Sequence, residues 1–308
     1  MKTSKAFTQK PIKLTLSSLL PSLLPSLLIL LLCLGTSSHA LAQEDEFTND
    51  PVSGTFETGL LGETQTIETP FAGEFELHIQ HRFGLMENGL EDVFGIYATS
   101  NIRMGFNYGI TKDFMLGYGY TKDFKLQEFQ GKYRIFNQTE SNSMPVSVAL
   151  YGNLSVNSLD KAYFGKNYKF SDRLGYFSQI IIAHKFNETF SLQFAPSFTH
   201  FNKTLDFAEH DKFALDLSGR AKVTSSLSMF FNYTQPLNID SMREYLKSEV
   251  TDPEANLTFG AEIGTSTHVF QVFITNYNGI TPQRNILYNQ NKIADGDFLF
   301  GFNILVRF

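Results

Sequence analysis

Apolar and polar residues alternate with a period of two through most of the chain after residue 43, and no stretch there has the pattern of a long amphipathic helix. The last segment is the clearest case. One face of it carries Phe298, Phe300, Phe302, Ile304, Val306 and Phe308, and the other carries Leu299, Gly301, Asn303, Leu305 and Arg307. The same contrast recurs in 74–82, 101–109 and 256–264, so the sequence predicts an all-β protein.

The chemistry of the two faces favours a membrane barrel over a soluble sandwich. A sandwich also alternates, but its polar face usually carries long charged side chains. Here the polar face is rich in Gly, Asn, Ser and Thr, whereas the apolar face is unusually aromatic. This combination is typical of a transmembrane antiparallel β-barrel with a lipid-facing exterior and a polar interior. Closing the barrel also removes the unpaired strand edges that a bilayer cannot hydrate.

The alternation predicts about twelve strands, and their connections give an independent check. The expected strands are 74–83, 101–110, 114–121, 126–137, 145–156, 173–186, 189–200, 213–222, 227–234, 256–265, 268–276 and 297–308. Long and short connections alternate between them, except that 122–125 is brief where a long one is due. If both termini are periplasmic, the long connections are extracellular.

Two places do not fit this pattern cleanly. Pro196 falls within an expected strand and cannot donate a ladder hydrogen bond, so we expect a bulge or a strand end there. The consecutive Ile180, Ile181 and Ile182 leave open which face of 173–186 meets lipid.

The N-terminus reads as a secretory signal peptide over residues 1–42. Lys2, Lys5, Lys10 and Lys13 precede an apolar run from Leu14 to Leu34, and Ala40-Leu41-Ala42 forms a cleavage site. An uncleaved anchor is the alternative, although prolines interrupt the run. Lipid attachment at Cys33 is disfavoured, because Leu32 stands where a small residue is required.

The rest of the chain divides into two parts. Residues 43–73 form an acidic periplasmic lead-in with seven acids and no Lys or Arg, and it is too short for the plug domain of a large transport barrel. Residues 74–308 form the barrel.

Composition excludes several classes of function. The formal net charge is -6, or -10 after residue 42, with no basic stripe, so no nucleic-acid partner is expected. The single cysteine, Cys33, lies in the predicted signal peptide, which excludes a disulfide framework and a thiolate metal site from the mature chain. We expect no cofactor. The expected partners are outer-membrane lipid, the barrel-assembly machinery and small solutes.

The run TFETGLLGETQTIETPFAGEFELHIQHRFG at 55–84, with SNIRMGFNYGITKDFMLGYGY at 100–120 and GKYRIFNQTE at 131–140, carries a resemblance to a known family. It resembles an uncharacterised domain-of-unknown-function family of Gram-negative, Bacteroidetes-type outer-membrane β-barrels. The resemblance implies a barrel in the cell outer membrane and carries no catalytic role. The terminal Phe308, at the end of an aromatic face, looks like the assembly signal of such barrels.

The candidate residues for chemistry are few. The six histidines after residue 42 show no metal spacing, and His78 and His81 should point to opposite faces of one strand. A lipid-modifying enzyme would need a contact such as Ser178 with His200, but no Gly-x-Ser-x-Gly motif is present. Ser241 and Glu244 have capping-box spacing, which predicts a short helix in 235–254 that either covers the barrel mouth or is a plain solvated loop helix.

The inward charges are the main functional evidence. Alternation predicts a lumen lined by Arg82, Arg103, Lys132, Arg134, Arg173, Arg220, Lys222 and Arg307, against Glu74, Glu76, Glu128, Asp216 and Glu262. The eight basic and five acidic residues predict a mildly cationic lumen, suited to a passive porin-like channel for small polar or anionic solutes. The alternative is a closed barrel, braced by paired charges, whose outer loops bind a partner or glycan.

Overall fold

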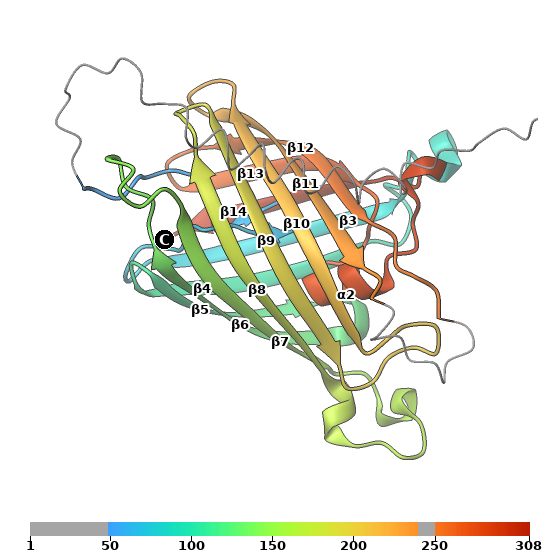
Figure 1. Ribbon diagram of the computed structural model, residues 1–308. Helices are drawn as coiled ribbons and strands as arrows, with labels where there is room; N and C mark the ends of the chain where they lie inside the picture. Colours follow the sequence, from blue (N-terminus) through green and yellow to red (C-terminus); the bar gives the residue numbers. More distant parts are fainter. Residues whose placement is uncertain (1–48, 240–249) are drawn as a thin grey trace, which may run out of the picture. The chain divides into compact units, whose positions relative to one another are not determined.

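The computed structural model describes residues 49–239 and 250–308, which form a closed antiparallel barrel (Figure 1). The predicted signal peptide and the helical patch at Ser241 lie outside the described residues. Twelve strands make the wall: β3 (Phe75–Leu85), β4 (Asn101–Thr111), β5 (Phe114–Thr121), β6 (Leu126–Phe136), β7 (Ser147–Asn157), β8 (Leu174–Lys185), β9 (Phe190–Phe201), β10 (Asp211–Lys222), β11 (Leu227–Leu237), β12 (Asn256–Gly264), β13 (His268–Thr275) and β14 (Leu299–Arg307). Each predicted strand is confirmed to within a few residues.

The first and last wall strands pair with each other and close the sheet. Ile304 of β14 lies opposite Ile79 of β3. Beyond the end of β14, Phe308 donates a backbone hydrogen bond to the carbonyl oxygen of Phe75 at 2.9 Å. Its ring is exposed and lies 6.2 Å from the Phe75 ring. Phe308 therefore lies where the two ends of the sheet meet, and its role as an assembly signal stays a prediction.

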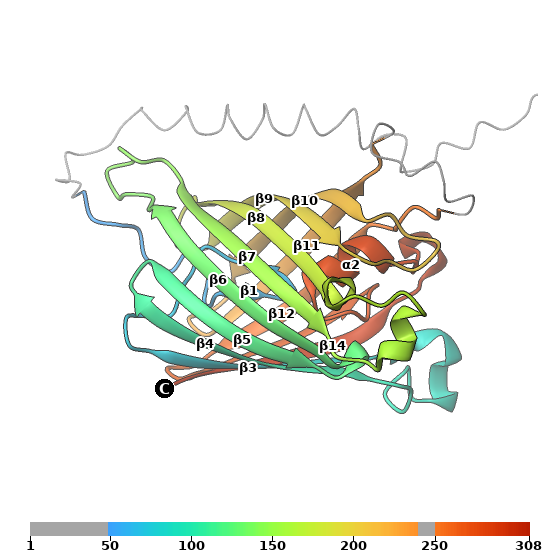
Figure 2. The same cartoon turned by 90° about the horizontal axis from the view of Figure 1, so that it is seen from below.

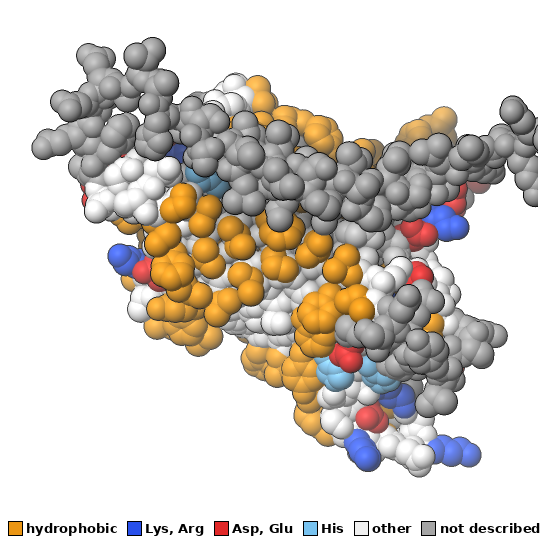
Figure 3. All heavy atoms as spheres, in the orientation of Figure 1, with side chains coloured by type: hydrophobic (Ala, Val, Ile, Leu, Met, Phe, Trp, Pro, Cys, Tyr) orange, Lys and Arg blue, Asp and Glu red, His pale blue; other side chains and the backbone are white. Residues whose placement is uncertain are grey.

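The outward face of the wall is apolar along almost every strand. Exposed side chains on this face include Ile102, Tyr108, Leu116, Tyr118, Phe129, Tyr133, Leu150, Ile180, Phe213, Phe259, Phe270 and Val272. Figure 3 shows such side chains spread over the face of the strands, with charged side chains gathered beyond the strand ends. Among the described residues, no helix has both the length and the apolar character needed to cross a bilayer.

The structure resolves both ambiguous strand positions. Ile180 and Ile182 face outward on β8, whereas Ile181 is fully buried inside the barrel. Pro196 lies in the middle of β9 with no bulge, so the prediction of a bulge or strand end was wrong. Pro196 keeps its register with β10. On the other side, β9 does not pair with β8 between the pairs Gln179–Ser197 and Ile182–Phe194, so the ladder is interrupted on that side alone.

The two ends of the barrel differ in the length of their connections. The long-loop end carries the connections 86–100, 122–125, 158–173, 202–210, 238–255 and 276–298. The short-turn end carries 112–113, 137–146, 186–189, 223–226 and 265–267. The expected alternation holds at most connections, with the predicted exception of the brief 122–125 and a second exception at 137–146, which has ten residues at the short-turn end. Both the start of β3 and the end of β14 lie at the short-turn end, and which side of the membrane that end faces stays a prediction.

Residues 55–68, called the plug from here on, lie inside the barrel rather than ahead of it (Figure 2). The chain enters at the short-turn end, where Lys185 binds the carbonyl oxygen of Ser53 at 3.0 Å. It turns through a small hairpin of β1 (Leu60–Leu61) and β2 (Thr64–Gln65). It leaves by the same end, where the Thr69 hydroxyl donates to the carbonyl oxygen of Lys112 at 2.9 Å. The predicted lead-in is thus, in its second half, an internal element.

A short helix closes the lumen from the opposite side. The helix α2 (Pro282–Tyr288) belongs to the 276–298 connection and packs against β8, β9, β10 and β11. Its Gln283, Asn285, Ile286 and Leu287 are buried. Because the plug occupies the interior from one end and α2 from the other, little of the lumen is left to solvent.

Candidate functional site: the lumen and its plug

Eight of the predicted lumen residues are buried inside the barrel. They are Arg82, Arg103, Lys132 and Arg220 with Glu76, Glu128, Asp216 and Glu262. The remaining five behave differently. Arg134, Lys222, Arg307 and Glu74 are only partly buried at the short-turn end. Arg173 is not on a strand, which corrects the expectation. It ends a 3-10 helix (Phe170–Arg173) in the 158–173 connection and donates to the carbonyl oxygens of Asn157 at 2.6 Å and Leu159 at 2.7 Å.

Part of the wall is braced by its own ion pairs. The Arg103 guanidinium contacts the Glu128 carboxylate at 3.0 Å and also donates to the Gln80 side chain at 2.9 Å. The Arg220 guanidinium contacts Glu262 at 3.0 Å. Lys212, which the sequence pattern missed because β10 starts earlier than expected, is buried and pairs with Glu209. The Arg103 and Arg220 pairs join strands two apart in the wall, β4 with β6 and β10 with β12, as the bracing alternative requires, whereas the Lys212 pair is local to the start of β10.

The plug supplies the other partners of the wall cations. Glu63 forms an ion pair with the fully buried Arg82. Glu57 contacts the second nitrogen of the Arg220 guanidinium at 2.9 Å. The Lys132 ammonium donates to the backbone carbonyls of Gly59 at 3.0 Å and Glu68 at 2.9 Å. Without Arg173, and with the buried pair of Lys212 and Glu209, the predicted set becomes eight basic and six acidic residues. Glu57, Glu63 and Glu68 of the plug raise the acids to nine, so the predicted cationic excess of the lumen is cancelled.

Hydrogen bonds, rather than ion pairs, hold the tip of the hairpin. Gly62, whose φ of 60° suits the tight turn, donates from its backbone to Gln271 at 3.1 Å. Its carbonyl oxygen accepts from Asn303 at 2.7 Å. The Thr64 hydroxyl donates to the Asp216 carboxylate at 2.9 Å. These contacts reach β10, β13 and β14, so the tip is fixed to strands across a wide arc of the wall.

One sector of the interior is apolar, contrary to the expectation of a polar lumen throughout. Its members from the wall are Met115, Ala149, Tyr151, Phe177, Ile181, Ala183, Ala195, Ala214, Phe230 and Phe273. Phe56, Leu61 and Ile67 of the plug and Ile286 of α2 are buried in the same cluster. The plug therefore shares one hydrophobic cluster with the wall and α2. Alternation alone could not reveal this cluster, because apolar residues occupy both faces of β8.

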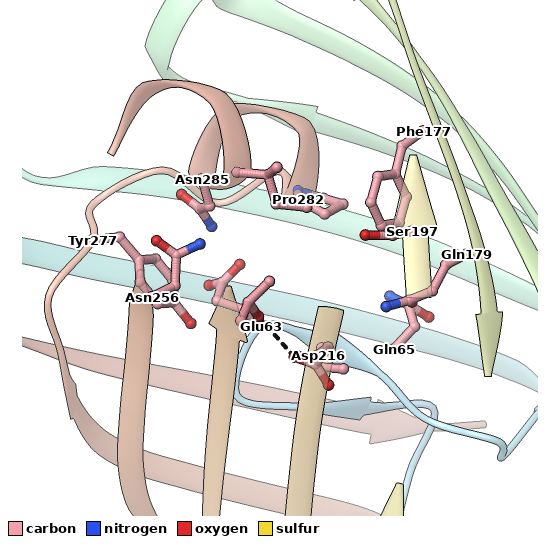
Figure 4. Close-up of a pocket in the computed structure, with 13 residues that line it drawn as sticks. Glu63, Gln65, Phe177, Gln179, Ser197, Asp216, Asn256, Tyr277, Pro282 and Asn285 are labelled. Carbon is pink, nitrogen blue, oxygen red and sulfur yellow. Dashed lines mark hydrogen bonds between the residues drawn. The ribbon is translucent and has the colours of Figure 1, made fainter. Parts of the chain in front are cut away.

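A small cavity remains where the plug meets α2. Figure 4 shows Glu63 and Asp216 near its floor and Pro282 and Asn285 of α2 opposite them. Its volume is about 30 Å³. A water needs at least about 10–15 Å³ by this measure, so the cavity holds only one to three waters. The space left between the plug and α2 is therefore too small for a solute much larger than water, and such a solute could pass there only if the plug or α2 moved.

The residues considered for catalysis or metal binding do not come together in a site. His200 faces outward, and its two ring nitrogens lie 2.7 Å from an oxygen of Asp211 and 2.9 Å from the amide oxygen of Asn202, so Ser178 is not its partner. His78 points inward and His81 outward, as expected. Within 49–239 and 250–308, no group of three or more His, Cys, Asp or Glu side chains is placed to hold a metal ion.

The closed twelve-strand barrel with an apolar exterior defines a membrane protein of the outer-membrane barrel type. More particularly, the chain belongs to the family described as a membrane-bound β-barrel domain, DUF5777, whose model matches residues 56–308. The predicted family and its membrane location are thereby confirmed, whereas the Bacteroidetes-type origin stays a prediction. The match starts at residue 56 rather than 74, so the plug belongs to the family domain.

Solved structures of similar architecture are porins and channels, at very low sequence identity. The NanC porin has a TM-score of 0.46 and 8% identity, covering 76% of this chain and 98% of that chain. The KdgM porin has a TM-score of 0.44 and 7% identity, covering 76% and 99%. OmpF of Salmonella typhi, in a complex with daunomycin, has a TM-score of 0.36 and 9% identity, covering 76% and 97%. No curated protein sequence matches the chain significantly.

Proposed function

We propose that this protein is an outer-membrane channel for small polar or anionic solutes that rests in a closed state, with residues 55–68 as a removable plug. The barrel lies in the outer membrane after insertion by the barrel-assembly machinery, and the long-loop end faces outward. A permanently open porin is not compatible with a filled lumen, so solute passage requires the plug to leave or shift.

The observation that carries the proposal is the way the plug is attached. Its two short strands pair only with each other. Among the described residues, no backbone hydrogen bond joins 55–68 to the backbone of a wall strand. The plug also enters and leaves by the same end of the barrel. It can therefore withdraw without breaking the ladder that closes the wall, whereas removal of any wall strand would open a sheet edge to lipid.

The charges indicate what the vacated lumen would favour. Withdrawal takes Glu57, Glu63 and Glu68 away and leaves Arg82 and Lys132 without their plug partners. A confined wall with an excess of one sign raises the local concentration of the opposite ion. Anions are thus the favoured solutes of the open state. The alternative, a permanently closed barrel whose long connections bind a partner, rests on the same filled lumen.

Planar-bilayer recording separates the two proposals. In one variant, a Gly-Ser segment of equal length replaces residues 55–68. We expect this variant to fold, shown by its altered mobility on gels without boiling, and to carry steady current that the parent carries only in rare openings. A Gly-Ser replacement of residues 141–144, in a turn at the same end of the barrel, should behave as the parent does. A folded 55–68 variant without current would favour the closed, partner-binding barrel.

A further inference from the structure

A second cavity lies at the long-loop end of the lumen, on the side of α2 away from the plug. Its volume is about 120 Å³, several times that of the cavity beside Glu63. Leu126, Ser155 and Phe201 line it from the inward faces of β6, β7 and β9. Arg284 and Tyr288 line it from α2. Since these wall residues point into the barrel, the cavity opens to the mouth of the lumen and not to lipid.

Three cations line this cavity, and two of them are already engaged. Arg173 donates to three oxygens, including the Tyr168 hydroxyl at 2.7 Å. The Lys203 ammonium binds the carbonyl oxygen of Phe164. Asp172 is the one acidic residue of the lining, and its carboxylate accepts from the backbone N–H of Lys169 at 2.9 Å. The lining therefore carries an excess of positive charge.

Arg284 differs from the other two cations because its guanidinium forms no ion pair and no hydrogen bond among the described residues, although the carboxylate of Asp123 lies near enough to attract it electrostatically. It lies between two rings instead, 3.5 Å from the Phe124 ring centre and 4.7 Å from that of Tyr288. Burial lowers the pKa of Arg284, but a guanidinium is so weak an acid that the group stays charged at neutral pH. Rings hold a guanidinium by its flat faces and leave its N–H edge available.

The backbone around Phe124 is strained in a way that fixes this arrangement. Phe124 has a φ of 60° and Lys125 a φ of 47°, a left-handed conformation that non-glycine residues rarely adopt. The conformation lies in the brief 122–125 connection and brings the Phe124 ring onto the guanidinium. Strain of this kind persists where the surrounding structure requires it, and it clusters at binding sites.

We propose that this cavity binds a small organic anion with a carboxylate and a ring, in which Arg284 pairs with the carboxylate and the aromatic lining contacts the ring. The proposal rests on the proposed function, since the bound anion would be a solute at the entrance of the channel. The same helix lines both cavities, because Pro282 and Ile286 face the one beside the plug. The proposed anion site and the tip of the plug therefore lie on opposite sides of α2.

Calorimetric binding to the folded full chain in detergent tests the site without any need for conduction. The probes are benzoate, its neutral counterpart benzyl alcohol, and acetate, which carries the charge without the ring. We expect benzoate to bind, and benzyl alcohol to bind at least about tenfold more weakly because it has no carboxylate to pair with Arg284. Acetate should also bind at least about tenfold more weakly, because it has no ring to contact the aromatic lining. Equal binding of benzoate and benzyl alcohol would overturn the proposal, and so would absence of benzoate binding to the folded parent.

Variants assign the binding to Arg284. Arg284→Gln should weaken benzoate at least about tenfold, and Arg284→Lys should recover part of the affinity, which a misfolded variant could not do. Lys292→Gln removes an exposed positive charge from the same connection and should leave affinity unchanged. Parent-like affinity in Arg284→Gln, or an equal loss in Lys292→Gln, would contradict the assignment. Currents of the 55–68 replacement test the channel separately, so failure of one proposal does not imply failure of the other.

Discussion

The wall and the plug are built from the same kind of structure but are held in different ways. Wall strands are eight to twelve residues long, and each pairs with two neighbours through a backbone ladder. The plug strands are two residues long and pair only with each other. What fixes the plug is side chains: ion pairs to Arg82 and Arg220, amide hydrogen bonds to Gln271 and Asn303, and a small apolar cluster.

In the proposed channel, the wall forms the barrel and the plug controls conduction. Backbone ladders in a bilayer have no alternative partner, so the wall is permanent. Side-chain contacts in the lumen can be exchanged for contacts with water when the plug leaves. The proposed channel is therefore in equilibrium between a closed state, with the plug in the lumen, and an open state, with the plug withdrawn. A change in one plug residue should therefore alter conduction far more than it alters the barrel.

The largest single effect is expected from Glu63→Gln. This change leaves the fully buried Arg82 without its carboxylate, and removal of one partner from a buried pair costs about 3–5 kcal/mol. Withdrawal of the plug relieves that cost by letting water reach Arg82. Because 1.4 kcal/mol corresponds to a factor of about ten, the ratio of open to closed channels should rise at least about 100-fold.

Single-channel recording measures this ratio directly. Glu87→Gln provides the matched control, because Glu87 is an exposed carboxylate in the 86–100 connection. It should leave the open fraction unchanged. If Glu63→Gln instead lowers the temperature at which the barrel unfolds and leaves the open fraction at the parent value, plug and wall form one cooperative unit, and the distinction drawn above is wrong.

A smaller effect concerns ion selectivity in the variant whose plug is replaced by Gly-Ser. Arg82 and Lys132 then face an open lumen, so chloride should pass more readily than potassium. The preference should be strongest near 0.01 M salt, where the Debye length is about 30 Å. Arg82→Gln with Lys132→Gln in that background should reduce the preference, which reversal potentials under a salt gradient would show. An unchanged reversal potential would remove both residues from the path of ions.

The smallest effect is expected outside the lumen, at the turn between β8 and β9. Lys185 donates to Glu188 at 2.7 Å and thereby holds the pKa of that carboxyl below its ordinary value of 4.5. This contribution to stability is present above pH 4.5 and is lost as the pH falls below it. Since Glu188 is largely exposed, Glu188→Gln should cost at most about 0.5 kcal/mol of unfolding free energy at pH 7 and less at pH 4. A larger loss, or an altered open fraction, would show that the turn contacts matter to gating.

The wall could be predicted from sequence because a period of two and the chemistry of the two faces both depend on nearby residues. Pro196 was misjudged, since a proline in mid-strand can be tolerated by loss of ladder pairs on one side alone. The apolar sector was missed because Ile181 faces inward between two outward isoleucines.

The plug could not be predicted, because its position depends on partners far along the chain. Glu63 meets Arg82, Glu57 meets Arg220, and Gly62 meets Gln271, and no local pattern indicates these pairings. One available signal was the imbalance of charge. Seven acids without a base precede a wall with a basic excess, which is consistent with a segment that supplies counter-charges to the lumen.

A reversible disulfide between plug and wall tests the central claim most directly. Thr64 and Asp216 contact each other at 2.9 Å, and the only natural cysteine is Cys33, before the described residues. In the Glu63→Gln background, the double variant Thr64→Cys with Asp216→Cys should conduct when reduced, close when oxidised and reopen with reductant, while Thr64→Cys alone should not respond. Full current through channels whose cross-link is verified by mass would contradict the account, because the plug would then be in place while solutes pass.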